Sequence, residues 1–247
     1  NVGIESAGVN PLRGQNNVQG ACDVGALPNV YPGYQKVADP DVREKFEREW
    51  NCSLSGETGL THVEIFDAIG DGRVKALYQV GENPVLSEAD ANHVKAALEI
   101  IDFYVVQDIF LTESAQYADV VLPAASFAEK DGTFTNTERR VQRVRKVIQP
   151  VGDSKADWWI TCEIAKRMGA PGFGFDHPRE IMEEINRVTP SYAGITYDRI
   201  ESDGLQWPCT DVGHEGTTFL HGDRFKTPSG KGRFMPLEYR ESAELPD

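Results

Sequence analysis

The chain lacks the patterns that mark metal-binding, membrane-spanning or nucleic-acid-binding segments. Its four cysteines are far apart, and no two have the spacing typical of zinc or iron–sulfur ligands. No apolar run approaches the ~18 residues that cross a membrane. A net charge of −14 argues against a nucleic-acid partner, because binding to phosphates requires clustered lysine and arginine. The five histidines are scattered, so we expect no protein-bound metal from them.

The composition is that of a globular protein. Of the 247 residues, 40% are hydrophobic and 26% are charged, which suffices for one sizeable core or two small ones. We expect the cysteines to be free thiols, buried or half-buried, as in a reducing compartment. The acidic balance and the absence of a signal pattern fit a cytoplasmic protein.

The middle of the chain alternates between strand and helix patterns. Apolar runs at 74–80, 103–106 and 119–122 have the length of buried strands, and helical periodicity separates them. Uniformly apolar strands joined by helices are typical of a parallel sheet covered on both faces. The sequence therefore predicts an α/β fold of the doubly wound, Rossmann-like type, with a mostly parallel sheet.

Several residues carry the signatures of helix starts. These are Asp39 with Pro40, Thr61 with Glu64, Ser87 with Asp90, and Ser154 with Asp157. A further helix is expected after Pro178, and residues 133–148 alternate as an extended or hairpin segment.

Composition shifts suggest three parts. Residues 1–35 are expected to form a segment that reaches a ligand site, and residues 36–188 to form the α/β domain. Residues 189–247 are rich in glycine, proline and threonine and are expected to form an irregular extension, with a solvated linker at 241–247.

Polar residues follow each expected strand. Gly81, with Asn83 and Ser87, comes after the first, Gln107 and Asp108 after the second, and residues 123–126 after the third. Ligands of open parallel sheets bind beyond the carboxyl ends of the strands. A dinucleotide would explain the set, because carboxylates accept ribose hydroxyls and guanine N–H groups and a turn before a helix faces phosphate. Each cluster by itself also fits a turn with a capping residue.

The segment 8–23 reads GVNPLRGQNNVQGACD and surrounds Arg13 with amides and glycines. Such a segment fits closely against a polar ligand, although the composition also suits a solvated loop. Continued by residues 25–35, it resembles the signature of the catalytic subunit of molybdenum- or tungsten-dependent formate dehydrogenases, within the molybdopterin oxidoreductase (DMSO reductase) family. On this resemblance the chain would be an internal fragment of such a subunit.

The resemblance implies an enzyme that interconverts formate and carbon dioxide. Its catalytic subunit would hold two molybdopterin guanine dinucleotides with Mo or W, and a 4Fe-4S cluster bound by a region that precedes this chain. Electrons would pass to partner subunits that carry iron–sulfur clusters or flavin. The fragment alone would be inactive.

The resemblance also assigns roles to particular residues. Arg13 would bind the formate carboxylate through its guanidinium fork, and Gln15 would hydrogen-bond the pterin. The positions that would contact the guanosine part of the cofactor are Gly81, Asn83, Ser87, Gln107, Asp108 and Asp157.

Within that set we expect Asp108 to hold ribose hydroxyls and Asp157 to contact the guanine edge. Asp157 also fits the fourth position of a capping box that begins at Ser154. Residues 129–132 resemble a family loop near the pterin, and they fit a simple turn equally well.

Three other interpretations remain open. The chain could come from a nitrate reductase or from the molybdopterin-like subunit of a respiratory complex. It could also be a non-catalytic scaffold that kept the fold and lost the cofactor. The formate-type sequence around Arg13 disfavours the first two, and the joint presence of the site residues disfavours the third.

Overall fold

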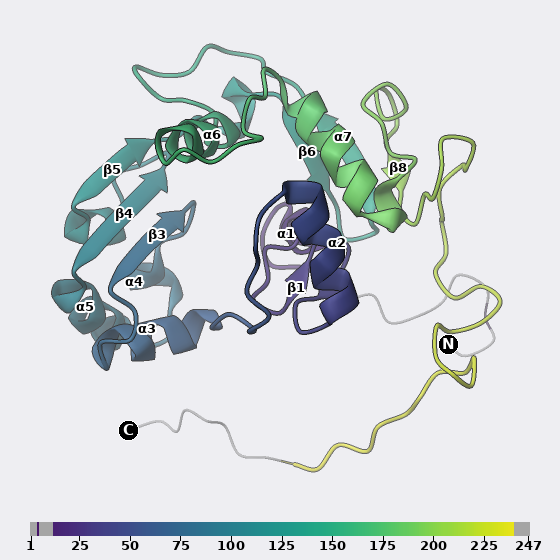
Figure 1. Ribbon diagram of the computed structural model, residues 1–247, viewed down its shortest axis with the longest axis horizontal. Coiled ribbons are helices and arrows are strands. Elements are labelled where there is room, and N and C mark those ends of the chain that lie inside the picture. Colours follow the sequence, from purple (N-terminus) through teal and green to yellow (C-terminus); the bar gives the residue numbers. More distant parts are fainter. Residues whose placement is uncertain (1–3, 5–11, 240–247) are drawn as a thin grey trace.

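A computed structural model describes residue 4 and residues 12–239 of the chain (Figure 1). Residues 8–11 of the N-terminal signature and the expected linker at 241–247 lie outside the described residues. The elements before the main sheet are α1 (Val18–Asp23), β1 (Val30–Tyr31), β2 (Gln35–Lys36), α2 (Pro40–Trp50) and α3 (His62–Gly70).

The main sheet is parallel and has the order β3-β4-β5. Its strands follow the apolar runs of the sequence, and short helices connect them as expected, so the α/β class is confirmed. The elements are β3 (Ala76–Val80), α4 (Pro84–Ser87), α5 (Ala91–Ile100), β4 (Phe103–Asp108), η1 (Ser114–Tyr117) and β5 (Val120–Pro123).

The first hydrophobic core lies between this sheet and helices α3, α4 and α5. Tyr104 and Val106 of β4 are completely buried against Phe66 of α3 and Leu98 of α5. This alternation along β4 directs every second side chain toward the helices. The helices thus fix one face of the sheet.

The second face is only partly covered, contrary to the expectation of helices on both faces. Among the described residues, the side chains of Tyr78, Val80, Phe103 and Val120 are between 39% and 48% exposed. From the sequence we expected both faces of these strands to be buried, because an apolar run does not show which face of the sheet is covered.

The helix starts were predicted with mixed success. Asp39 caps α2, and the Glu64 carboxylate accepts the Thr61 N–H at 2.7 Å, as expected. The start at Ser87 was wrong. Ser87 ends the four-residue α4, and Asp90 caps α5 by accepting the N–H of His93 at 2.9 Å.

A second core lies around an antiparallel sheet of order β6-β7-β8 (Figure 1). Val141, Met182, Ile195, Ile200 and Cys209 are buried in it. This second core thus joins residues on both sides of position 188. The division of the chain into parts at residues 35 and 188 stays a prediction. The remaining elements are η2 (Phe127–Glu129), β6 (Gly132–Thr135), β7 (Arg140–Val144), α6 (Asp157–Arg167), α7 (Pro178–Val188), η3 (Pro190–Tyr192) and β8 (Leu205–Gln206).

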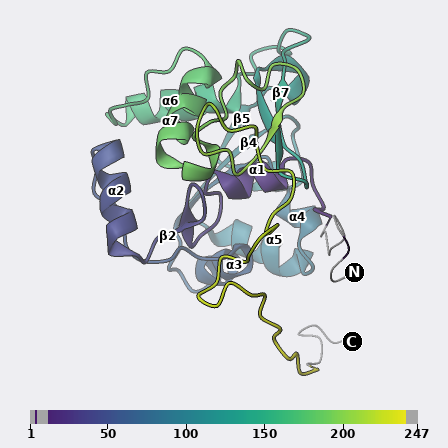
Figure 2. The same cartoon turned by 90° about the vertical axis from the view of Figure 1, so that its right-hand side faces the viewer.

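After residue 217 the described chain has no helix or strand and runs down one side of the molecule (Figure 2). Phe234 and Leu237 in this segment are more than 90% exposed. All four cysteines are free thiols. Cys162 and Cys209 are buried, whereas Cys52 is exposed, contrary to expectation. None of the described helices is long and apolar enough to cross a membrane.

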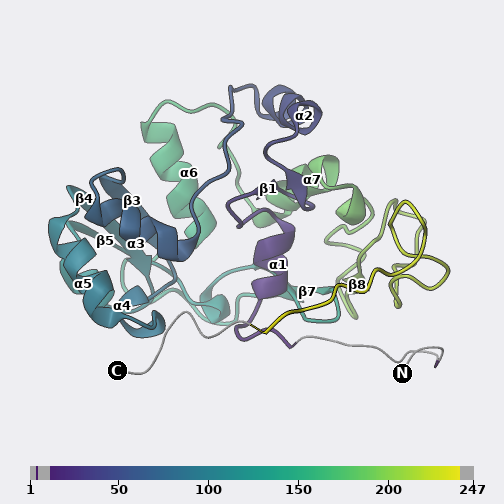
Figure 3. The same ribbon diagram turned by 90° about the horizontal axis from the view of Figure 1, so that it is seen from below.

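A buried carboxylate ties the N-terminal helix to the C-terminal segment. Helix α1 lies beside the β6–β7 hairpin (Figure 3), and Asp23 at its end is 1% exposed. The hydroxyl of Tyr192 and the indole N–H of Trp207 both donate to Asp23 Oδ2 at 2.6 Å. Gln19 and Tyr34 donate to Oδ1 at 2.7 and 2.8 Å.

Burial raises the pKa of Asp23, and the hydrogen bonds of its four partners lower it in part. Burial also raises the pKa of Tyr192, which therefore stays a donor. Four donors around one buried carboxylate compensate for part of its lost hydration. The cluster joins segments of sequence that are up to 184 residues apart.

Replacing Tyr192 with Phe should remove one donor and leave the carboxylate less satisfied. We expect a loss of about 1–3 kcal/mol in the free energy of unfolding, measured by urea denaturation. Tyr239→Phe is the matched control, since Tyr239 is 89% exposed and its hydroxyl should contribute little. Equal stability of the two variants would contradict a structural role for the Asp23 cluster.

Candidate functional site

The strand ends of the main sheet meet at one edge. The parallel register pairs Val80 with Gln107 and Asp108 with Pro123. Beyond these pairs, the N–H of Gly81 donates to Gln107 O, and the N–H of Ala124 donates to Asp108 O, both at 2.9 Å. The polar clusters that the sequence placed after separate strands therefore lie side by side, as parallel strands require.

A cavity of about 280 Å³ opens at this edge. It is bounded by the ends of β3 and β4, the turn after β5, and the start of α6. Four of the predicted site residues line it, namely Gly81, Gln107, Asp108 and Asp157. The other lining residues are Ile109, Ala124, Ala125, Ser126, Phe127 and Lys130.

Gln107 connects the sheet to α6. Its side chain is fully buried, and its amide N–H donates to Asp157 Oδ1 at 2.7 Å. The Tyr78 hydroxyl donates to the amide oxygen of Gln107. Burial raises the pKa of Tyr78, so the phenol remains a donor. A buried amide with partners at both ends holds the start of α6 over the strand ends.

Asp157 is not part of a capping box. Ala156 is the N-cap residue of α6 and makes no side-chain cap. The Ser154 hydroxyl instead donates to Val151 O at 2.7 Å, so the expected pairing of Ser154 with Asp157 is wrong. The Asp157 carboxylate faces Gln107 and also accepts from the ammonium of Lys130.

Asp108 has an acceptor left over for a ligand. Its Oδ1 accepts the backbone N–H groups of Ile109 at 2.7 Å and Phe110 at 3.2 Å. Its Oδ2 has no donor among the described residues. Gly81, which follows β3 and lines the same cavity, leaves open space there, because a Cβ at this position would meet nothing within 4 Å.

Asn83 and Ser87 contact other residues and do not line the cavity. The Asn83 amide donates to Glu113 at 2.8 Å and accepts from the Ser114 hydroxyl at 2.6 Å. The Ser87 hydroxyl donates to Glu82 at 2.7 Å. Contact with a dinucleotide at these two positions stays a prediction.

Arg13 and Gln15 are exposed and lie outside the residues that line the cavity. The nearest anchor of their segment is Asn17, whose side chain accepts the N–H of Thr135 at 2.9 Å and so fixes the start of α1 to β6. The roles of Arg13 and Gln15 at a metal and pterin also stay predictions.

Two residues of the site, Tyr78 and Lys130, could not be assigned from the sequence. Tyr78 lies within an apolar strand pattern, which gives no sign of its contact with Gln107. Lys130 was expected only as part of a loop or turn at residues 129–132, yet its ammonium contacts Asp157. The family loop near residues 129–132 was the one available signal. Among the described residues, no three His, Cys, Asp or Glu side chains gather as metal ligands would.

The molybdopterin oxidoreductase family model matches residues 1–167. The chain therefore belongs to the molybdopterin oxidoreductase family, and the resemblance noted in the sequence is confirmed.

Two relatives come from methanogens. The chain is 56% identical, over its whole length, to the F420-dependent formate dehydrogenase subunit alpha of Methanocaldococcus jannaschii. It is 53% identical to the F420-dependent formate dehydrogenase 2 subunit alpha of Methanococcus maripaludis, again over its whole length. In both cases the chain spans 36% of the length of the relative.

Among solved structures, acetylene hydratase from Pelobacter acetylenicus superimposes with a TM-score of 0.53. The match covers 77% of this chain and 26% of that one, at 23% sequence identity. It supports the α/β fold.

The turn that forms one wall of the cavity should be sensitive to acid. The Glu129 carboxylate accepts the N–H groups of Ser126 at 2.7 Å and Val151 at 2.9 Å. The bonds from Ser126 hold the pKa of Glu129 below its usual value. A lowered pKa in the folded state stabilises the fold above the unfolded-state pKa, and this stabilisation is lost as the pH falls through the folded-state pKa.

Glu129→Gln should therefore be less stable than the wild type at neutral pH, and the difference should shrink between about pH 5 and pH 3. Urea denaturation at several pH values measures it. Glu57→Gln, at an exposed position, is the control. A difference that does not change with pH would show that the Glu129 charge is not involved.

Proposed function

We propose that this chain is the part of a formate dehydrogenase catalytic subunit that binds a molybdopterin guanine dinucleotide. The observation that carries the proposal is the gathering of Gln107, Asp108 and Asp157 around one cavity at the carboxyl edge of a parallel sheet. Membership of the molybdopterin oxidoreductase family and the similarity to formate dehydrogenase alpha subunits support it.

The donors and acceptors of the cavity fit the guanosine part of such a cofactor. A carboxylate can accept about four hydrogen bonds, and Asp157 uses two of these on Gln107 and Lys130. Its remaining lone pairs suit the N1–H and N2–H groups of guanine. Asp108 Oδ2 suits a ribose hydroxyl.

Arg13 and Gln15 complete the proposal at the substrate end. Formate has no side chain, so its two oxygens are the only groups by which a protein can orient it. A guanidinium matches both oxygens at once. We assign substrate binding to Arg13 and a hydrogen bond to the pterin to Gln15.

The bound metal centre, Mo or W, would supply the redox chemistry that removes two electrons and a proton from formate and leaves carbon dioxide. The second dinucleotide and the 4Fe-4S cluster would be held by other parts of the subunit. Partner subunits with iron–sulfur clusters or flavin would receive the electrons, and the complex would be cytoplasmic. Alone, the chain would lack formate oxidation activity.

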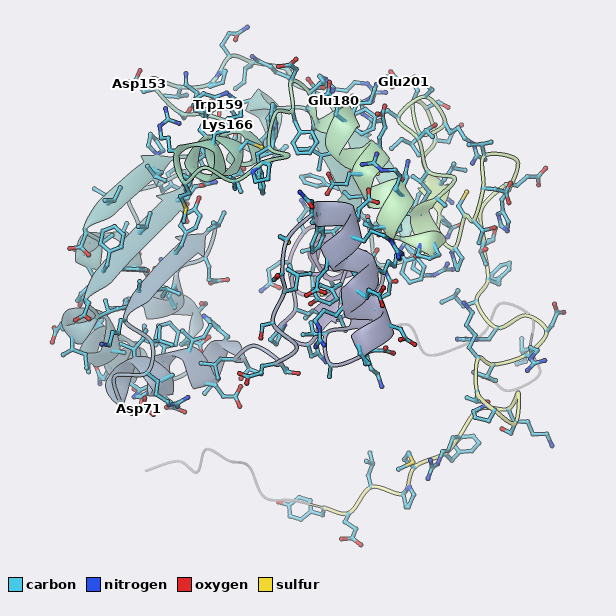
Figure 4. The ribbon with its side chains drawn as sticks, in the orientation of Figure 1. Asp71, Asp153, Trp159, Lys166, Glu180 and Glu201 are labelled. Carbon is cyan, nitrogen blue, oxygen red and sulfur yellow. The ribbon has the colours of Figure 1, made fainter. Side chains whose placement is uncertain are left out.

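Asp108→Ala and Asp157→Ala, made in the whole catalytic subunit, should reduce the bound guanine dinucleotide by tenfold or more, since each removes a charge-assisted acceptor. Release of GMP by acid hydrolysis and quantification by mass spectrometry measures the content. Asp153→Ala serves as the control, because Asp153 is exposed in the loop before α6 (Figure 4). Full cofactor content in both site variants would remove the cavity from the proposal.

Arg13→Lys should keep the positive charge but lose the fork. We expect formate turnover to fall by about 10²-fold or more while metal content is unchanged, since removal of a positioned charged donor typically costs this much. Dye reduction and elemental analysis of the whole subunit measure the two quantities. Arg48→Lys, at an exposed position on α2, is the control. Normal turnover by Arg13→Lys would exclude Arg13 from the substrate site.

A further inference from the structure

Lys130 extends from the turn after β5 to the start of α6. Its ammonium donates to the backbone oxygen of Ala125 at 2.8 Å and to Asp157 Oδ2. The side chain is 26% exposed, so most of its length is packed against protein. An ammonium carries three N–H donors, and these two contacts use two of them. The third has no acceptor among the described residues.

The third donor lies close to where a base would bind. Lys130 and Asp157 both line the 280 Å³ cavity, together with the ribose-binding candidate Asp108. Because the ammonium already contacts one oxygen of Asp157, any group that hydrogen-bonds this carboxylate comes next to it. A ligand on Asp157 therefore meets a positive charge with a free N–H.

Guanine has the complementary pattern. Its N1–H and N2–H groups donate along one edge, and the acceptor O6 lies directly beside N1–H. When a carboxylate accepts the two donors, O6 comes next to that carboxylate. A lysine held on the same carboxylate can donate to O6, and the bond is charge-assisted.

We propose that Lys130 determines base specificity in this cavity by donating its third N–H to guanine O6, while Asp157 accepts N1–H and N2–H. This inference rests on the proposed function and adds a residue to it. Adenine has an amino group where guanine has O6, so it would place a donor against the ammonium. Lys130 thus favours guanine and opposes adenine.

A purely structural role for Lys130 makes a different prediction. If the lysine only held the turn against α6, its replacement would weaken the binding of all bases alike. If the lysine contacts O6, its replacement changes the relative affinities of ligands that differ at that atom. The ratio of two affinities within one variant therefore separates the roles, whereas a single affinity does not.

Three nucleoside diphosphates serve as probes in calorimetric titrations of the whole catalytic subunit, produced without bound molybdopterin cofactor. GDP carries the full base edge, 6-thio-GDP replaces O6 by the weaker acceptor sulfur, and IDP lacks the N2 amine. The variants are Lys130→Met and Lys130→Arg. Lys155→Met is the matched control, because Lys155 is exposed, does not line the cavity, and joins the same turn only through its backbone.

The wild type should prefer GDP to 6-thio-GDP by about tenfold and GDP to IDP by a similar factor. Lys130→Met should bind GDP and 6-thio-GDP equally and keep its preference over IDP. Lys130→Arg and Lys155→Met should keep both preferences.

Two results would overturn the proposal for Lys130 while leaving the proposed function in place. One is a Lys130→Met variant with the wild-type ratio of GDP to 6-thio-GDP. The other is a wild-type protein that binds GDP and 6-thio-GDP equally and still prefers GDP to IDP. This second result does not depend on the folding of any variant. A wild-type protein with no preference for GDP over IDP would instead contradict the proposed function.

Discussion

The site depends on one buried amide, that of Gln107. It lies on the central strand of the parallel sheet and is fully buried, so both ends of its side chain need partners. Tyr78 on the neighbouring strand donates to one end, and Asp157 on α6 accepts from the other. Because an unpartnered amide in this place would be costly, the first turn of α6 is held at the edge of the sheet. The cavity lies between the ends of the strands and this first turn of α6.

Around the cavity one ammonium offsets one of the two lining carboxylates, in a chain that carries a net charge of −14. Lys130 pairs with Asp157, and Asp108 is stabilised by two backbone N–H groups. Each carboxylate is thus held in place and still has lone pairs for a ligand. A site of this kind suits a neutral base and a ribose, which offer N–H and O–H donors.

Much of the fold could be predicted, because apolar runs such as 103–106 identify buried strands and parallel strands bring their carboxyl ends together. The proximity of Gln107, Asp108 and Gly81 follows from that register. The contact of Gln107 with Asp157 spans 50 residues, and it depends on the position of α6, which no local pattern encodes. The residues of the second core could not be placed from the sequence for a related reason. Its residues after 188 lie in irregular backbone, where hydrophobic periodicity is absent.

The proposed function depends most on one contact, that of the Asp157 carboxylate with the N–H groups of a guanine in this cavity. A crystal structure of the chain grown with GDP would reveal this contact. We expect the base beside Asp157, with N1 and N2 within hydrogen-bond distance of the carboxylate and the ribose at Asp108. A nucleotide bound elsewhere, with the carboxylate of Asp157 still contacting only Gln107 and Lys130, would contradict it.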